Sequence, residues 1–248
     1  MDESIRELSP IGNGVEIYVS RHHTFGTDAV ILNHFAAAKP RDSVVDLGTG
    51  CGIIPFLMLR KGGPKSIVGV DISEEAIDLA TLTKEKNGFN NFTPVLSDLN
   101  ELRGKVEFGC HNLVTCNPPY KATDAGIKNP DSVLSVARHE VACTLEDIVS
   151  VSARLLQTGG RLCMCHRPER LVDALAIMRQ YKLEPKIMRL ISPCHGKEAN
   201  LVLIYGIKNA EEAFADINSG ISIAIVNTEK GRELFDGIKQ NVIWQKKS

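Results

Sequence analysis

The sequence predicts an α/β fold whose core is a mainly parallel sheet of seven strands, with the last strand antiparallel and helices on both faces. From about residue 43 onward, short β-branched runs alternate with amphipathic helical stretches, which is the pattern of βαβ units. The last two runs are joined by the loop PCHGKEA (residues 193–199) rather than by a helix, which favours an antiparallel hairpin at one edge. At 248 residues the chain is also long enough for one large core.

The elements follow from these runs in order. The predicted strands cover residues 43–48, 66–72, 92–98, 111–117, 161–166, 186–192 and 200–207. The predicted helices lie between them, at residues 53–61, 74–87, 145–156 and 168–181. Ser73 is typical of a helix N-cap, and Glu74 and Glu75 follow it in the first turn, where carboxylates favour the positive end of the helix dipole. We expect Gly159 and Gly160 to end the third helix and turn into the next strand.

The same pattern suggests how the chain is organised. We expect one α/β domain at residues 41–208, an N-terminal extension at 1–40, and a C-terminal extension at 209–248 packed on the same domain. The stretch SGISIAIVNTEKG (residues 219–231) could add one more strand, and this alternative stays open.

Composition limits the class of protein. Apolar residues at 43% and charged residues at 24% are ordinary globular values, and a net charge of −1 means that a polyanion would have to be held by a local patch. Seven cysteines without a CxxC pair argue against a disulfide framework and a tetrahedral zinc site, and indicate a reducing cytosol. The start MDESIRELSP lacks a signal-peptide pattern, and no apolar run reaches the roughly 20 residues needed to cross a bilayer. We expect a soluble cytoplasmic protein with no membrane partner and no metal.

A glycine-rich turn follows the first predicted strand. The stretch DLGTGCG (residues 46–52) places Gly48, Gly50 and Gly52 where a ligand can approach the backbone closely, because no Cβ stands in the way. The spacing is GxGxG rather than the GxGxxG of dinucleotide sites. Asp46 stands just before the loop, which suits a ligand with a cationic amino-acid end better than a pyrophosphate.

Two further carboxylates end the next two strands. Asp71 comes 21 residues after Gly50, where a carboxylate can accept both hydroxyls of a ribose; the alternative is a solvated charge at a strand end. Asp98 ends the third strand, where it could accept a hydrogen bond from an adenine amino group or simply cap a helix. Three acidic strand ends and a glycine loop together indicate S-adenosylmethionine as the ligand.

The fourth strand runs into NPPY (residues 117–120). Two prolines cannot continue a central strand, and each pushes the preceding residue into an extended conformation. Asn117 and Pro118 should therefore aim their oxygen atoms in fixed directions, with the ring of Tyr120 close by. The alternative is a Pro-Pro turn that only ends the strand.

Taken together, DLGTGCG, VGVDIS (68–73), SDL (97–99) and NPPY resemble the class I S-adenosylmethionine-dependent methyltransferases, over about residues 20–208. This resemblance implies a Rossmann-like fold and methylation of an amino group. Asn117 and the Pro118 carbonyl would accept the two N–H groups of the substrate, while Tyr120 stacks on a flat substrate group. The implied catalytic residues are Asn117, Pro118 and Tyr120, and the implied cofactor-binding residues in this part of the chain are Asp46, Gly48, Gly50, Gly52, Asp71, Ile72, Asp98, Leu99 and Asn117.

Two flanking segments narrow the resemblance. HTFGTDAVIL (23–32) and ARHE (137–140) are similar to segments of the bacterial tRNA1(Val) adenine-N6-methyltransferase family, which methylates the adenine 3′ of the anticodon. The resemblance implies an extension over the cofactor and a tRNA anticodon stem-loop as partner. The cofactor would be covered by Phe25, Gly26, Thr27 and Asp28, and the RNA would be contacted by Lys121, Arg138 and His139. Structurally, residues 26–28 could merely cap a helix and residues 138–140 could be a surface charge cluster. The Tyr-Thr-x-Glu usual near the family's C-terminus is reduced here to residues 227–229, NTE.

Two other functions remain open. A protein glutamine-N5-methyltransferase acting on a release factor would also use NPPY, although such enzymes usually carry a helical N-terminal domain for which about 40 residues leave little room. A scaffold that binds the cofactor without turnover is disfavoured because both Asn117 and Tyr120 are present.

Overall fold

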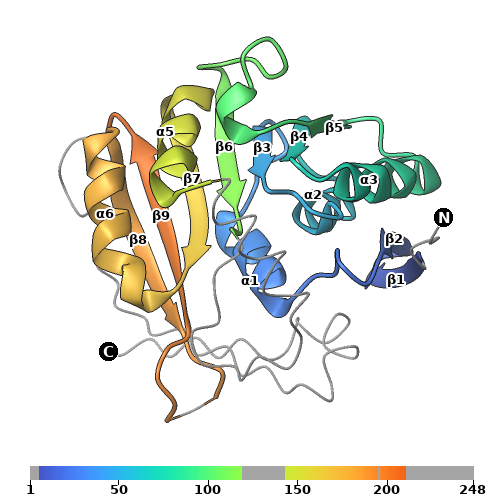
Figure 1. The fold of residues 1–248 in the computed structure, drawn as a ribbon, viewed down its shortest axis with the longest axis horizontal. Helices are drawn as coiled ribbons and strands as arrows, with labels where there is room; N and C mark the ends of the chain where they lie inside the picture. Colours follow the sequence, from blue (N-terminus) through green and yellow to red (C-terminus); the bar gives the residue numbers. More distant parts are fainter. Residues whose placement is uncertain (1–5, 119–142, 195, 211–248) are drawn as a thin grey trace.

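The computed structural model describes residues 6–118, 143–194 and 196–210 of the chain (Figure 1). Its main feature is a seven-stranded sheet with the strand order β5-β4-β3-β6-β7-β9-β8. The strands are β3 (Ser43–Leu47), β4 (Ser66–Asp71), β5 (Phe92–Leu96), β6 (His111–Cys116), β7 (Leu156–His166), β8 (Leu183–Ile191) and β9 (Leu201–Lys208). Neighbouring strands from β5 to β7 pair in parallel, and β9 is antiparallel to both β7 and β8. The predicted fold class is confirmed.

The final hairpin has an arrangement that its sequence does not reveal. It lies at one edge, as expected, but β9 is inserted between β7 and β8, so β8 forms the edge itself. β8 also begins three residues before the prediction, because Leu183, Glu184 and Pro185 are buried against β9. β7 begins at Leu156 rather than at 161, and Gly159, with a φ of 78°, lies inside the strand instead of before it.

Helices cover both faces of the sheet (Figure 1). They are α1 (Thr27–Ala36), α2 (Ile53–Leu59), α3 (Glu74–Asn87), α5 (Leu145–Leu155) and α6 (Leu171–Gln180), with short 3-10 turns η1 (Leu99–Glu101) and η2 (Pro168–Arg170). The predicted helix at 168–181 is thus divided into η2 and α6. Ser73 caps α3 as predicted, since its side chain accepts from the Ala76 N–H.

Two hydrophobic clusters explain how the layers hold together. Adjacent residues of a strand point to opposite faces, so Val44 belongs to the cluster under α1, α2 and α3, whereas Val45 belongs to the cluster under α5 and α6. Cys163 and Met164 of β7 alternate in the same way, and all four side chains are fully buried. The sheet therefore has two apolar faces, as parallel sheets with helices on both sides require.

The N-terminal region forms a β-hairpin followed by α1. The sequence analysis predicts no strand in this region. β1 (Glu7–Gly12) and β2 (Val15–Val19) pair antiparallel, and their side chains Ile11 and Ile17 are buried in the first cluster. The hairpin is fixed to α3, because the Tyr18 N–H donates to Thr83 Oγ1 at 2.9 Å and Asn87 Nδ2 donates to the Glu16 carbonyl at 2.8 Å. Among the described residues, no helix is long and apolar enough to span a membrane.

Candidate functional site

The loop between β3 and α2 carries the three glycines of the motif. Gly48, Gly50 and Gly52 have left-handed backbones, with φ of 67°, 55° and 83°. A Cβ atom at Gly48 or Gly50 would meet no heavy atom within 4 Å, so the loop leaves open space beside its backbone. A Cβ atom at Gly52 would lie 2.5 Å from the Phe56 ring, so this glycine allows close packing of the loop on α2. Two of the three glycines thus present bare backbone to a ligand.

Asp71 holds this loop next to α3. Its Oδ2 atom accepts a hydrogen bond from the Gly50 N–H at 2.8 Å, and its Oδ1 atom accepts from the Ser73 N–H at 2.9 Å. The residue is 8% exposed, which excludes the alternative of a solvated charge. A carboxylate oxygen has more than one acceptor site, so these two bonds leave capacity for ribose hydroxyls.

Asp46 is a buried carboxyl group with unsatisfied hydrogen-bonding capacity. It is 1% exposed, and its Oδ1 atom accepts from the Thr115 hydroxyl at 2.5 Å. Its Oδ2 atom and the Thr49 hydroxyl are buried without a hydrogen-bond partner among the described residues. Burial raises the pKa of Asp46 to about 7, against the opposing effect of the Thr115 hydroxyl. A buried carboxyl group with one oxygen left without a partner, beside an open glycine loop, fits the cationic amino-acid end of S-adenosylmethionine.

The strand register brings the cradle and the NPPY motif together. Leu47 of β3 lies beside Val70 of β4 and beside Cys116 of β6. One residue further along, each chain segment reaches its functional residue, namely Gly48, Asp71 and Asn117. The glycine loop, the carboxylate and the amide therefore lie at one level on the carboxyl edge of the sheet, where ligands of such folds bind.

Asn117 makes a contact that the sequence analysis missed. Its Oδ1 atom accepts from the Cys165 thiol at 2.7 Å, because the register that pairs Cys116 with Met164 places Cys165 at the next level of β7. The sequence suggests only that Cys165 is a core residue, and it is indeed fully buried. Only the register could have revealed this contact. Asn117 is half-buried and Pro118 is buried, as expected for a constrained strand exit.

The remaining residues of the predicted cofactor site lie at neighbouring strand ends. Asp98 is the N-cap of η1 and accepts from the Asn100 N–H at 2.8 Å, so the cap that the sequence left open is present. Leu99, the first residue of η1, is half-buried. Ile72 follows Asp71 and is 46% exposed, an unusual exposure for an isoleucine, and it gives this edge an apolar surface.

The segment before α1 also has the geometry of a helix start. Gly26 is the N-cap residue of α1, and Thr27 and Asp28 lie in its first turn. Phe25 is partly buried and packs against the first hydrophobic cluster. These residues therefore form the start of α1, without a side-chain hydrogen bond at its cap, and their role in covering a ligand stays a prediction. Tyr120, Lys121, Arg138 and His139 lie outside the described residues.

The match to known proteins covers the region that contains the site. A family model described as a methyltransferase domain matches residues 38–212. The chain belongs to this methyltransferase domain family. The match contains the glycine loop, Asp71 and the NPPY motif, so the resemblance drawn from these motifs is confirmed.

This methyltransferase is also similar to curated proteins with named activities. It is 26% identical over 188 residues to the tRNA1(Val) (adenine(37)-N6)-methyltransferase of Porphyromonas gingivalis, covering 72% of each chain. It is 34% identical over 140 residues to the protein of the same name in Pedobacter heparinus, covering 54% of this chain and 56% of the relative. The release factor glutamine methyltransferase of Buchnera aphidicola is 30% identical over 165 residues, covering 62% and 57%.

Solved structures show the fold of the methyltransferase. TYW2 of M. jannaschii, solved in complex with AdoMet, superposes with a TM-score of 0.56 at 12% identity, covering 83% of this chain and 87% of that chain. Geranyl diphosphate C-methyltransferase from Streptomyces coelicolor, solved with S-adenosyl-L-homocysteine, gives a TM-score of 0.52 at 16% identity, covering 73% and 78%. At these identities the likeness concerns the fold alone.

Three buried or partly buried cysteines of the methyltransferase, Cys51, Cys143 and Cys163, are not activated nucleophiles. Burial raises the pKa of the Cys51, Cys143 and Cys163 thiols to about 12, so these groups remain protonated at neutral pH. In the part of the chain that the structure describes, no group of three or more His, Cys, Asp or Glu side chains could hold a metal ion.

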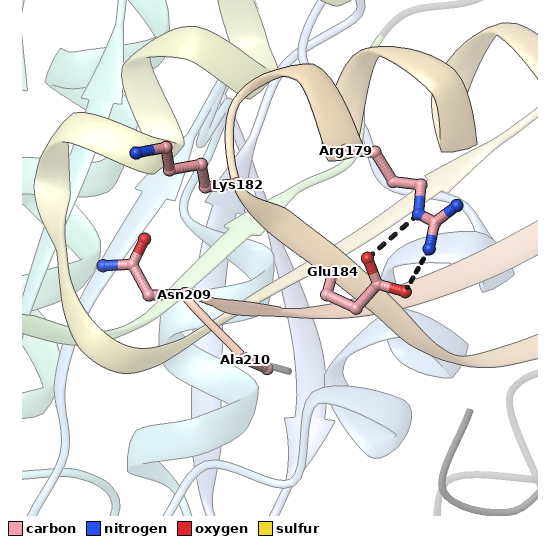
Figure 2. Close-up of a pocket in the computed structure, with 5 residues that line it drawn as sticks. All are labelled: Arg179, Lys182, Glu184, Asn209 and Ala210. Carbon is pink, nitrogen blue, oxygen red and sulfur yellow. Dashed lines mark hydrogen bonds and ion pairs between the residues drawn. The ribbon is translucent and has the colours of Figure 1, made fainter. Parts of the chain in front are cut away.

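A separate pocket lies where α6 turns into β8 and β9 ends (Figure 2). Figure 2 shows Arg179 directed at Glu184, to which it donates two hydrogen bonds of 3.0 and 3.3 Å. The wall is completed by Lys182, Asn209 and Ala210, and the Asn209 N–H donates to the Lys182 carbonyl at 2.8 Å. The pocket adjoins the start of β8 and the end of β9, and it shares no residue with the site at the carboxyl edge.

Proposed function

We propose that this chain is an S-adenosylmethionine-dependent methyltransferase that methylates the N6 amino group of an adenine in tRNA, namely the adenine 3′ of the anticodon. The observation that carries the proposal is the common level of Gly48, Asp71 and Asn117, which brings an amide acceptor next to a cofactor cradle. The names of the relatives support tRNA as the substrate.

The residues of the glycine loop and of the neighbouring strand ends would bind different parts of the cofactor. Asp71 would accept from the ribose, the bare loop at Gly48 and Gly50 would admit the amino-acid end, and Asp46 would supply negative charge to it. Ile72 and Leu99 would offer apolar surface to the adenine, and Asp98 would accept from its amino group. When bound, the cofactor supplies an electrophilic methyl group.

The chain's own residues prepare the substrate amine for attack. The lone pair of an adenine amino nitrogen is delocalised into the ring, so the amine is a weak nucleophile. Acceptance of its two N–H groups by Asn117 Oδ1 and the Pro118 carbonyl orients the lone pair toward the methyl group, and Tyr120 stacks on the base. The nitrogen becomes acidic only after methylation, so no strong base is needed before transfer; the methylated amine would then release its proton to water, and the transfer would leave the neutral thioether S-adenosylhomocysteine.

The contact with Cys165 bears on this mechanism. A thiol that donates to Asn117 Oδ1 favours one rotamer of the amide and leaves a second acceptor site on the same oxygen for the substrate. This explains how a half-buried amide can be ready to accept before the substrate arrives.

The RNA would be held by residues that flank the site. Lys121, Arg138 and His139 supply positive charge to the phosphates of an anticodon stem-loop, whose unpaired bases can be splayed out at low cost. We further propose that residues 1–40 cover the cofactor through Phe25, Gly26, Thr27 and Asp28, that residues 209–248 pack on the same domain, and that the enzyme acts in the cytoplasm.

A second candidate, methylation of a release-factor glutamine, is favoured by one specific observation. A relative named release factor glutamine methyltransferase is 30% identical over 165 residues. A glutamine amide has the same two N–H groups as an adenine amine, so the Asn117 acceptors would serve either substrate.

Methyl transfer from labelled S-adenosylmethionine separates the two substrates. The purified protein is incubated with tRNA and with release factor in parallel, and labelled tRNA is digested for nucleoside mass spectrometry. We expect N6-methyladenosine in tRNA and no methylglutamine. Label found only in the release factor would replace the proposal by the second candidate, and label in neither substrate would overturn both.

Asn117→Ala tests the same proposal at the residue that carries it. Turnover should fall at least about 100-fold, as expected when a hydrogen bond made in the transition state is lost, while cofactor affinity stays nearly unchanged. The matched control is Asn90→Ala, an exposed asparagine between α3 and β5, which should behave as wild type. Near-normal turnover of Asn117→Ala would remove NPPY from catalysis.

A further inference from the structure

His23 connects the segment before α1 to the N-terminus of α3. Its Nε2 atom lies 3.0 Å from Ser73 Oγ and 3.8 Å from Glu75 Oε2, and its side chain is 16% exposed. The backbone around it is folded into a turn, in which the Ser20 N–H donates to the His23 carbonyl at 3.1 Å and the His23 N–H donates to Ser20 Oγ at 3.2 Å. This turn directs the imidazole toward α3.

Ser73 continues the path into the candidate cofactor site. Its N–H donates to Asp71 Oδ1, and the other oxygen of Asp71 accepts from the Gly50 N–H. Three consecutive hydrogen bonds therefore join His23 to the glycine loop. Glu75 Oε1, in the same cluster, is buried without a hydrogen-bond partner among the described residues.

Residues 20–26 are anchored on both sides of this contact. On one side, β2 is held by α3 through Tyr18 and Thr83. On the other side, α1 is held in the core through Leu32 and Phe35. Arg21, His22 and Thr24, between the anchors, are exposed. Loss of the His23 contact should therefore loosen residues 21–24, while Phe25, which packs against the first hydrophobic cluster, and both anchors keep the fold in place.

We propose that His23 is a positioning residue for the cofactor: it latches residues 20–26 against Ser73, so that this segment forms a wall beside Asp71 and slows cofactor release. The inference rests on the proposed function, since it assigns a cofactor to the cradle. It adds a residue outside the glycine loop and the strand ends, with a role in retention of the cofactor rather than in methyl transfer.

The test compares three variants in the full chain. His23→Ala removes the contact, and His23→Gln can restore it, because the glutamine amide reaches about as far as Nε2. His22→Ala is the matched control, an exposed histidine one residue away. S-adenosylmethionine affinity is measured by calorimetry, its dissociation rate by stopped flow, and kcat and KM with tRNA.

We expect His23→Ala to weaken cofactor affinity about 3- to 10-fold, the range of a single hydrogen bond, chiefly through faster dissociation. The KM for the cofactor should rise by a similar factor, while kcat at saturating cofactor changes less than about twofold. His23→Gln should recover most of the affinity, and His22→Ala should match the wild type.

Two results overturn the latch while leaving the proposed function intact. One is wild-type affinity in His23→Ala; the other is a loss of kcat and thermal stability that His23→Gln does not rescue, which would make His23 merely structural. If His23→Ala does not fold, hydrogen exchange of the wild type decides: the cofactor must slow exchange in residues 20–26, and unchanged exchange there refutes the latch. A wild type that does not bind S-adenosylmethionine fails the proposed function itself.

Discussion

Replacing Asp46 by asparagine should change stability and cofactor affinity in opposite directions at alkaline pH. The pKa of the buried Asp46 carboxyl rises from 3.8 to about 7 on folding, chiefly through burial. The folded protein therefore binds more protons than the unfolded chain between about pH 4 and pH 7. Its stability falls as the pH rises through this window, because the carboxylate must ionise without enough compensating hydrogen bonds.

The magnitude follows from the size of the shift. A shift of about three pKa units corresponds to about 4 kcal/mol, of which about 2–3 kcal/mol should develop between pH 5 and pH 8. Asparagine is neutral throughout and keeps an oxygen for the Thr115 hydroxyl. Its unpaired N–H groups, placed where Oδ2 lacks a partner, cost about 1–3 kcal/mol at every pH. About 1.5–2 kcal/mol has already developed at pH 5, so the two proteins should differ little there, and Asp46→Asn should gain about 2–3 kcal/mol relative to the wild type by pH 8.

Urea denaturation of both proteins at pH 5 and pH 8, without cofactor, measures this change. Calorimetry at pH 8 should show weaker binding of S-adenosylmethionine to the variant, since the charge facing its amino-acid end is gone. If the stability difference between the two proteins is the same at both pH values, Asp46 does not ionise with a raised pKa and the reasoning fails.

Three further predictions concern the loop, the sheet and the substrate. Gly52→Ala should destabilise the fold by about 1–3 kcal/mol more than Gly48→Ala in urea denaturation, because both backbones are left-handed but only the Cβ at Gly52 would meet the Phe56 ring. Gly48→Ala should weaken cofactor binding as well, and equal stability losses of the two variants would contradict this difference in surroundings. Burial lowers the pKa of His111, so the unfolded chain binds more protons and stability should fall as the pH drops below about 6.5; His111→Gln should show a flatter profile from pH 7 to pH 5, and an unchanged slope would exclude His111 as the cause. Tyr120→Ala should reduce kcat/KM for tRNA roughly 5- to 150-fold and Tyr120→Phe much less, since stacking on an aromatic ring is worth about 1–3 kcal/mol per base; equal losses would assign the role to the hydroxyl.

Most of the sheet could be predicted because its signals are local. A β-branched run such as the one around Val44 and Val45 indicates a buried strand wherever it occurs. The N-terminal hairpin lacks such a signal, since Ser9, Pro10 and Gly12 interrupt the apolar alternation of β1. Its stability comes instead from α3, some 65 residues later, through Thr83. Long-range support of this kind leaves no pattern within the segment itself.

The residues of the site also fall into those that the sequence predicts and those that only the structure reveals. Gly48, Asp71 and Asn117 were found because each stands at a fixed place in a short motif. Cys165 and His23 were not, because their roles depend on pairing of β6 with β7 and on the position of the hairpin relative to α3. Asp98 shows why a motif alone does not separate two roles. The motif predicts both a helix cap and a contact with the cofactor for this residue, and the structure shows the capping bond to Asn100.

The position of β9 determines how this protein can be synthesised. Residues 201–208 leave the ribosome after β7 and β8, yet they must enter between them and pair with both. Until then, two strands with apolar side chains such as Met164 and Leu183 present unpaired backbone edges, which are templates for pairing with other chains. A chain that ends before residue 201 therefore keeps two unpaired strand edges, and such fragments should depend on chaperones or aggregate.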